Sequence, residues 1–151
     1  MSSVLQWDCM LNLVWTTSVY SDVASLAVAA PSPEKTTVLA ANLISPQVVV
    51  GEVRPRRRTE EGLEVAAMLD GKAPVAVSLA GDLVVCASGR GDHSLLVYRY
   101  QQDRRGWSQV AELSAHTDQI SSIAISSDTS QLCAAAWDGR VSIWCLGINL
   151  N

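Results

Sequence analysis

Few residues of this 151-residue sequence are of the types that carry out acid–base or nucleophilic chemistry. The two histidines are His93, in a polar glycine-containing stretch, and His116, which precedes an apolar run. We expect His93 to be solvent-exposed and His116 to make structural hydrogen bonds. Glu60 and Glu61 are adjacent in a polar segment, whereas the carboxyl pairs of acid–base catalysis face each other across a cleft. Because the chain also has no glycine-rich phosphate-binding loop of either common spacing, the sequence predicts a protein that is not an enzyme.

The cysteine pattern predicts neither a metal site nor a disulfide framework. The chain has four cysteines, Cys9, Cys86, Cys133 and Cys145, with no Cys-x-x-Cys pair and no histidine at ligand spacing. Three of them lie in apolar runs typical of strands, where a reduced cysteine packs as a small hydrophobic residue. We therefore expect no metal or other cofactor, and an intracellular location in the cytoplasm or the nucleus.

The overall composition narrows the classes of partner. Acidic residues outnumber basic ones by 15 to 11, which argues against a general binder of nucleic acids or membrane surfaces. Charged residues make up only 17% of the chain, so part of its surface should pack against a core or a partner rather than face water. We expect no membrane span, since no apolar run reaches the ~18 residues that a spanning helix needs, and no signal peptide, since no basic segment opens the chain.

Six arginines form the one charged feature that could bind a ligand. They fall in two equivalent connections between strand-like runs: Arg54, Arg56, Arg57, Arg58, Arg104 and Arg105. If both connections emerge on one face, they form a basic patch on a protein of net charge −4, suited to an acidic protein surface, RNA or a phosphorylated ligand. The simpler interpretation is a solvated loop, partly neutralised by Glu60, Glu61 and Asp103.

A tripeptide of the kind that integrins bind occurs at Arg90-Gly91-Asp92. Glycine and aspartate are also the residues that a turn between strands requires. We therefore interpret this tripeptide as part of a turn.

Strand-like runs recur along the chain with a nearly constant period. The starts of three similar runs, Val48, Leu95 and Val141, are separated by 47 and 46 residues. Each is preceded by two further runs of the same kind and by a fourth run near the start of its unit. Short runs rich in valine and isoleucine, separated by Gly, Pro, Asp and Ser, are typical of strands and turns. A fixed period of this length indicates a repeat architecture.

The last unit resembles a WD repeat of a β-propeller. Ala115-His116 stands at the family's Gly-His position, Ser126-Ser127-Asp128 at its polar turn, and Trp144-Cys145 at its closing Trp-Asp. The resemblance implies a polar network that braces the blade, made here by His116, Asp138 and Trp144. The Ser or Thr of that network falls near Ala134, which leaves the expected brace without its hydroxyl.

The earlier units resemble the family less closely. Asp70-Gly71 stands where Gly-His is expected, Tyr98 replaces the closing tryptophan, and the unit at 10–53 keeps only the rhythm of its strands. In the family, each unit supplies the outer strand of one blade and the three inner strands of the next. The strand at 3–8 then belongs to a preceding blade.

We therefore predict an all-β chain that forms a single incomplete WD-repeat β-propeller over residues 1–151. It should contain three repeat units of four antiparallel strands, at 10–53, 63–100 and 107–146, after the leading strand 3–8. Because closed rings have about four to eight blades, we expect the chain to be the C-terminal part of a longer propeller, either as a truncated form or isoform or completed by a partner that supplies the missing blades.

The resemblance implies a non-catalytic scaffold or adaptor that mediates protein–protein assembly in an intracellular complex. The alternative is a propeller whose basic face, at 54–58 and 104–105, binds RNA or phosphorylated ligands. Salt dependence separates the two, because phosphate binding weakens steeply as salt rises.

Overall fold

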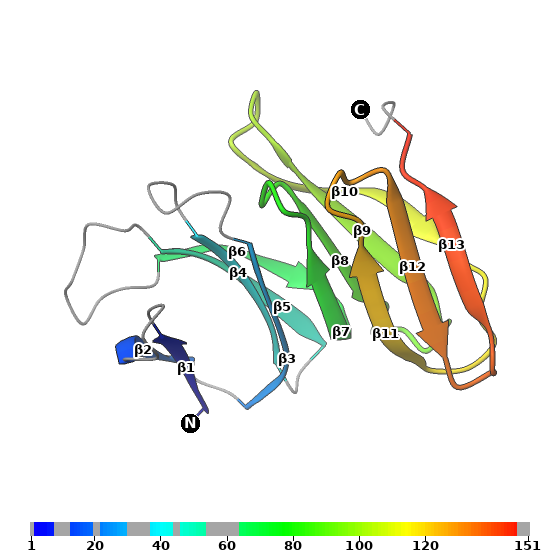
Figure 1. Ribbon diagram of the computed structural model, residues 1–151, viewed down its shortest axis with the longest axis horizontal. Helices are drawn as coiled ribbons and strands as arrows, with labels where there is room; N and C mark the ends of the chain where they lie inside the picture. Colours follow the sequence, from blue (N-terminus) through cyan, green and yellow to red (C-terminus); the bar gives the residue numbers. More distant parts are fainter. Residues whose placement is uncertain are drawn as a thin grey trace.

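The computed structural model describes residues 2–7, 13–19, 22–29, 37–43, 46–53 and 64–147, and every regular element in these ranges is a β-strand (Figure 1). The first seven strands are β1 (Ser2–Trp7), β2 (Leu13–Val19), β3 (Val23–Ala29), β4 (Thr37–Leu43), β5 (Gln47–Val53), β6 (Glu64–Asp70) and β7 (Lys72–Val77). The other six are β8 (Leu83–Ala87), β9 (Leu95–Gln101), β10 (Gly106–Leu113), β11 (Ile120–Ile125), β12 (Gln131–Ala136) and β13 (Val141–Cys145). The prediction of an all-β fold is confirmed.

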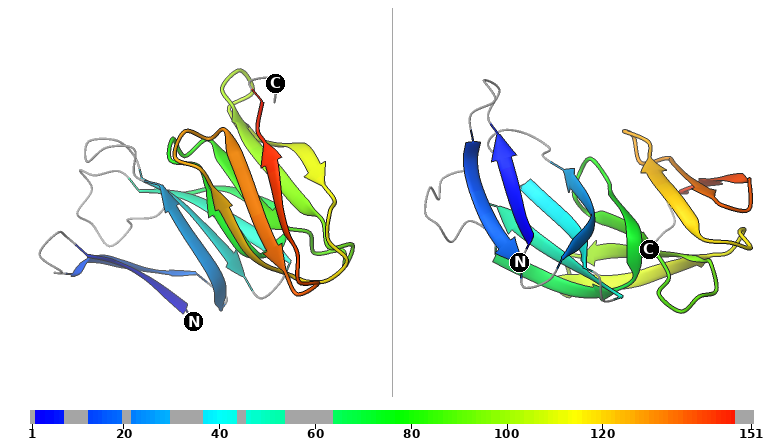
Figure 2. Two further views of the ribbon diagram at one scale, coloured as in Figure 1. Left: turned by 45° about the vertical axis from the view of Figure 1, so that its right-hand side comes forward. Right: turned by 90° about the horizontal axis from the view of Figure 1, so that it is seen from below.

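The strands form separate antiparallel sheets, which follow one another along an arc from β1–β2 to β13 (Figures 1 and 2). Strands β1 and β2 pair only with each other. The larger sheets are numbered from there: the first sheet has the order β3-β4-β5-β6, the second sheet the order β10-β9-β8-β7, and the third and last sheet the order β11-β12-β13. Strands β6 and β10 each complete one sheet immediately before the chain begins the next, as the WD-like pattern predicts.

Equivalent serines shape the turns between the first two strands of the second and third sheets. Ser78 N–H donates to the Leu83 carbonyl at 2.9 Å, and Leu83 N–H donates back to Ser78 Oγ at 3.1 Å. Ser126 and Gln131 repeat both bonds in the next sheet, each at 2.9 Å. A serine satisfies backbone groups that a tight turn leaves unpaired, so the same residue type recurs at this point of the period.

The core lies between sheets, and β8 contributes to both sides of it. Its five residues are all buried, and they alternate between two apolar clusters. Val84 and Cys86 face the preceding sheet and pack with its Val48, and with Tyr98 of their own sheet, among others. The remaining residues of β8 pack against the last sheet. A central strand that is covered on both faces has a continuous apolar sequence, and residues 83–87 show this pattern.

The cysteines differ from the sequence expectation in one respect. Cys86 is buried, and burial, followed by the nearby Asp70 carboxylate, raises its thiol pKa to about 12. Cys133 is half-buried, but Cys145 is exposed rather than packed in a core. Its side chain points away from the neighbouring sheet because it alternates with Trp144 along β13. Cys9 lies outside the described residues.

Candidate functional site

His116 is buried in the connection between β10 and β11, at the centre of a side-chain network. Its Nδ1 lies 3.0 Å from Asp138 Oδ2. Because a carboxylate only accepts, Nδ1 carries the proton, and in the neutral ring Nε2 then accepts from Ser142 Oγ at 2.7 Å. The ring also meets Trp144 edge to face, with centroids 6.4 Å apart. Both ring nitrogens are occupied, so this geometry offers no acceptor for a substrate proton.

Asp138 links this network to the backbone of two turns. Its Oδ2 also accepts from Thr117 N–H at 3.0 Å, and its Oδ1 accepts from Arg140 N–H at 2.9 Å. These bonds, with Thr117 contributing most, followed by Arg140 and His116, hold the pKa of the Asp138 carboxyl below its usual value. The structure thus brings together all three residues of the expected brace. Their contribution to stability remains a prediction.

The hydroxyl of the network comes from a residue that the repeat pattern of the sequence did not identify. Ala134 was expected to leave the brace without a hydroxyl. Ser142 lies directly opposite Ala134 in the β12–β13 pairing, and it supplies the group from the neighbouring strand. The alternation along β13 could have identified it, because Ser142 and Trp144 share one face of the strand.

The second sheet replaces this network with a shorter one. Tyr98 takes the position of Trp144, and its hydroxyl donates to the Asp70 carbonyl at 2.8 Å. Burial is the main cause that raises the Tyr98 pKa to about 12. Gly71 leaves no room for a side chain, because a Cβ there would collide with Cys86 Sγ. A histidine at this point could not be accommodated, which explains the departure of Asp70-Gly71 from the family pattern.

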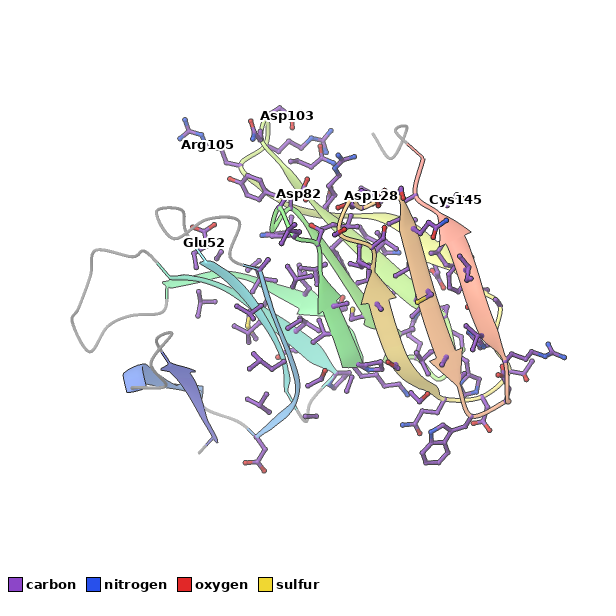
Figure 3. All side chains as sticks on the ribbon, in the orientation of Figure 1. Glu52, Asp82, Asp103, Arg105, Asp128 and Cys145 are labelled. Atoms are coloured by element: carbon purple, nitrogen blue, oxygen red, sulfur yellow. The ribbon has the colours of Figure 1, made fainter. Side chains whose placement is uncertain are left out.

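Of the six arginines predicted to form a basic patch, the structure describes only Arg104 and Arg105. Arg54, Arg56, Arg57 and Arg58 lie outside the described residues. Arg104 and Arg105 are exposed in the turn between β9 and β10, where Arg105 adopts a positive φ of 48°. Figure 3 shows Asp103 and Arg105 at the tip of this turn, so an acidic side chain accompanies the basic pair. That all six arginines form one surface remains a prediction.

The Arg90-Gly91-Asp92 tripeptide is part of an ion-pair network that joins a turn to β10. Arg90 Nη2 lies 2.7 Å from Glu112 Oε1, and Arg90 Nε lies 3.3 Å from Asp92 Oδ2. Ser94 Oγ lies 2.9 Å from Asp92 Oδ1 and 3.1 Å from Glu112 Oε1. Both charged side chains of the tripeptide therefore make contacts within the protein, as expected for a structural turn. His93, expected to be exposed, is half-buried with a φ of 56°.

A hollow of about 330 Å³ opens between the serine turns of the second and third sheets. Asp82, Arg99 and Asp128 line it. Asp128 accepts from Ser126 Oγ and from Ser130, which lower its pKa to about 2. Among the described residues, no three His, Cys, Asp or Glu side chains group as a metal site would require.

The last sheet carries an exposed apolar face, which we call the outward face: Ala124, Cys133, Ala135, Val141, Ile143 and Cys145. These side chains alternate with those that pack against the second sheet. Val141 and Ile143 are 71% and 67% exposed. Their counterparts at the start of β9, Leu95 and Val97, are fully buried against the last sheet. The outward face therefore has the composition of a surface between sheets but lacks a neighbour among the described residues.

The comparisons agree with this architecture. The family described as "WD domain, G-beta repeat" matches residues 107–145. The solved structure of Saccharomyces cerevisiae Sqt1, a WD40 propeller, superposes on 85% of the chain with a TM-score of 0.62 and 14% sequence identity. The chain spans about a third (32%) of the length of that protein. No curated protein matches the chain by sequence. No described helix is long and apolar enough to cross a membrane. Residues 107–145 are therefore a WD repeat, and the chain has the fold of part of a WD-repeat β-propeller.

Proposed function

We propose that this chain is a non-catalytic scaffold or adaptor segment that assembles proteins within an intracellular complex. The outward face is the observation that carries the proposal. Its side chains have the composition of the buried surface between the second and third sheets, but among the described residues no neighbour covers them. WD-repeat proteins are usually non-catalytic and typically act as interaction scaffolds, which supports the same interpretation.

Burial of the outward face against a partner would contribute favourably to association. Complete burial of a valine or isoleucine side chain stabilises by about 1.5–3 kcal/mol. Because Val141 and Ile143 are about two-thirds exposed, covering the two together should contribute about 2–4 kcal/mol. Contiguous apolar surface of this kind marks interaction sites in soluble proteins.

The edge of β13 adds a second route to association. No described residue pairs with the side of β13 that faces away from β12. An unpaired strand edge presents N–H and C=O groups that pair readily with another chain.

The test is the association state of purified residues 1–151. We expect self-association in light scattering at low micromolar concentration and binding of a hydrophobic dye. The Val141→Asp/Ile143→Asp double variant should lose most of both signals, because it places two charges on the outward face. Leu79→Asp is the matched control, since Leu79 is an exposed aliphatic residue in a turn outside that face.

Two results would count against the proposal. One is a dye-silent monomer with a sharp melting transition for the unmodified chain. The other is equal association of the double variant and the unmodified chain. Salt dependence addresses the alternative function: association through apolar contacts persists as salt rises, whereas binding of RNA or phosphorylated ligands by the arginines weakens steeply.

A further inference from the structure

We infer that a hollow of about 230 Å³ between the first and second sheets binds a basic side chain of a partner polypeptide, which Asp70 recognises by its charge. Such binding rests on the proposed assembly function and adds the class of side chain that the partner presents. We call this site the Asp70 hollow. Its lining residues all fall within positions 46–109, so it is separate from the outward face and from both ends of the chain.

The Asp70 hollow lies where the second sheet departs from the side-chain network of the last sheet. In the last sheet, the buried ring of His116 accepts from Ser142 Oγ at 2.7 Å. The equivalent positions of the second sheet are Gly71 and Leu96, and both line the hollow. A glycine supplies no side chain and a leucine no polar group, so a network in one sheet corresponds to a hollow in the other.

Close contacts between the two sheets fix the walls of the hollow. Gly71 N–H donates to the Pro46 carbonyl at 3.1 Å. Gly89 approaches the same proline so closely that an added Cβ would lie 2.7 Å from Pro46 Cβ. All three residues line the hollow, which is therefore formed before a partner arrives. Pockets for drug-sized ligands measure about 300–1,000 Å³, so this smaller volume suits a single side chain.

The charges around the hollow favour a cation. Arg90 lines it, but its guanidinium is engaged by Asp92 at 3.3 Å and by Glu112 at 2.7 Å. Asp70 also lines it, and its carboxylate makes no ion pair or hydrogen bond with the residues that the structure describes. These four groups, three acidic and one basic, carry a net charge of −2. Lys72, the next basic residue along the chain, does not line the hollow, so the Asp70 carboxylate is the group that a ligand can neutralise.

The shape of a basic side chain matches this arrangement. Its cationic head can donate to Asp70 through charge-assisted hydrogen bonds, which are stronger than neutral ones. The side-chain amide of Gln109, at the exposed rim, offers a further acceptor. The apolar stem can pack on Leu96 and Pro46, as lysine and arginine stems do on apolar surfaces. A carboxylate ligand would instead face Asp70, and juxtaposed like charges lower affinity.

Saturation-transfer difference NMR on purified residues 1–151 tests the site, because this method detects weak ligands of large or associated proteins. The probes are Nα-acetyl-arginine methylamide, its neutral citrulline analogue of nearly the same shape, and Nα-acetyl-glutamate methylamide. We expect the arginine probe to bind at millimolar concentration and about fivefold more tightly than the citrulline probe, because only arginine completes an ion pair. The glutamate probe should bind most weakly.

Two matched pairs of variants assign the signal to the Asp70 hollow. Asp70→Asn should abolish the preference for arginine over citrulline, whereas Asp103→Asn, in the turn beyond the far end of β9, should keep it. Gln109→Arg places a competing cation at the rim and should weaken arginine binding, whereas Gln102→Arg, in the turn that holds Asp103, should not. All four side chains are exposed, so these changes leave the core intact. If Asp70→Asn lowers the melting temperature, the Gln109→Arg pair decides instead.

Three outcomes would overturn the inference. They are no binding of the arginine probe at millimolar concentration, equal binding of the arginine and citrulline probes, or an arginine preference that survives Asp70→Asn (or Gln109→Arg, where the first variant is destabilised). Preferential binding of the glutamate probe would assign the hollow to Arg90 and would overturn it as well.

The same measurements separate this inference from the proposed assembly function. That function still stands in each of these cases if the Val141→Asp/Ile143→Asp variant loses association. If arginine binding depends on Asp70 but that variant keeps its association, the outward face fails as the docking surface while the Asp70 hollow remains supported.

Discussion

Replacement of Gly71 by alanine should destabilise the protein substantially, for two separable reasons. Gly71 has a φ of +150°, a backbone conformation that residues with a side chain rarely adopt. An added Cβ would also collide with Cys86 Sγ and lie 3.2 Å from the Ala87 carbonyl oxygen. Backbone strain of this kind costs about 1–3 kcal/mol, and overpacking in a core costs about 1–3 kcal/mol. We therefore expect Gly71→Ala to lower the free energy of unfolding by about 2–5 kcal/mol.

Chemical denaturation followed by circular dichroism can measure this loss and separate its two causes. Gly71→Ala combined with Cys86→Ala removes the sulfur from the collision. The double variant should be more stable than the sum of the single variants predicts, by about 1–3 kcal/mol. Gly91→Ala isolates strain, because Gly91 has a φ of +79° and no atom near its added Cβ. Gly147→Ala should change nothing, since a Cβ there meets open space and its φ is not positive. An unfolding free energy for Gly71→Ala within 0.5 kcal/mol of the Gly147→Ala control would refute the reasoning, since ~0.5 kcal/mol is the usual spread of neutral surface changes.

Three further predictions concern the last sheet. Trp144→Ala should lower the free energy of unfolding by about 3 kcal/mol through lost aromatic burial, and His116→Ala should lower it by about 1–3 kcal/mol. Denaturant melts measure both, and near-zero effects of both would show that the brace is not structural. Ser142→Ala should cost about 1–3 kcal/mol because it leaves buried His116 Nε2 without its partner, whereas Ser127→Ala, in an exposed turn, should be neutral in the same melts. The folded pKa of Asp128, lowered to about 2, implies stabilisation that is complete above the ordinary carboxyl value of 3.8 and is lost as pH falls towards about 2. The stability difference between the unmodified chain and Asp128→Asn should therefore shrink in that window, and a difference that stays constant from pH 6 down to about 2 would contradict the assignment.

The strands and their order were predictable from the sequence because their signals are local. Runs such as 83–87 and 141–145 are apolar and bounded by turn residues, and their spacing repeats along the chain. The assignment of β6 and β10 to the sheet that precedes each unit followed from the WD resemblance, and the sheet orders confirm it.

The composition of each network was decided only by the tertiary structure. The sequence pattern identified His116, Asp138 and Trp144 as neighbours. It placed the network's Ser or Thr position near Ala134, which has no hydroxyl. Register across β12–β13 places Ser142 there instead. In the second sheet, Tyr98 reaches a backbone carbonyl, a partner that no side-chain pattern can reveal.

Sequence by itself thus determined the strands, their repeat and the WD repeat at 107–145. Tertiary structure decided that Arg90 and Asp92 serve an ion-pair network with Glu112, and that Val141 and Ile143 face away from the core. The physical reason is the range of each interaction. Strand formation depends on alternation and turn residues within a few positions, whereas the partner of a side chain depends on which strands align and which face another sheet covers.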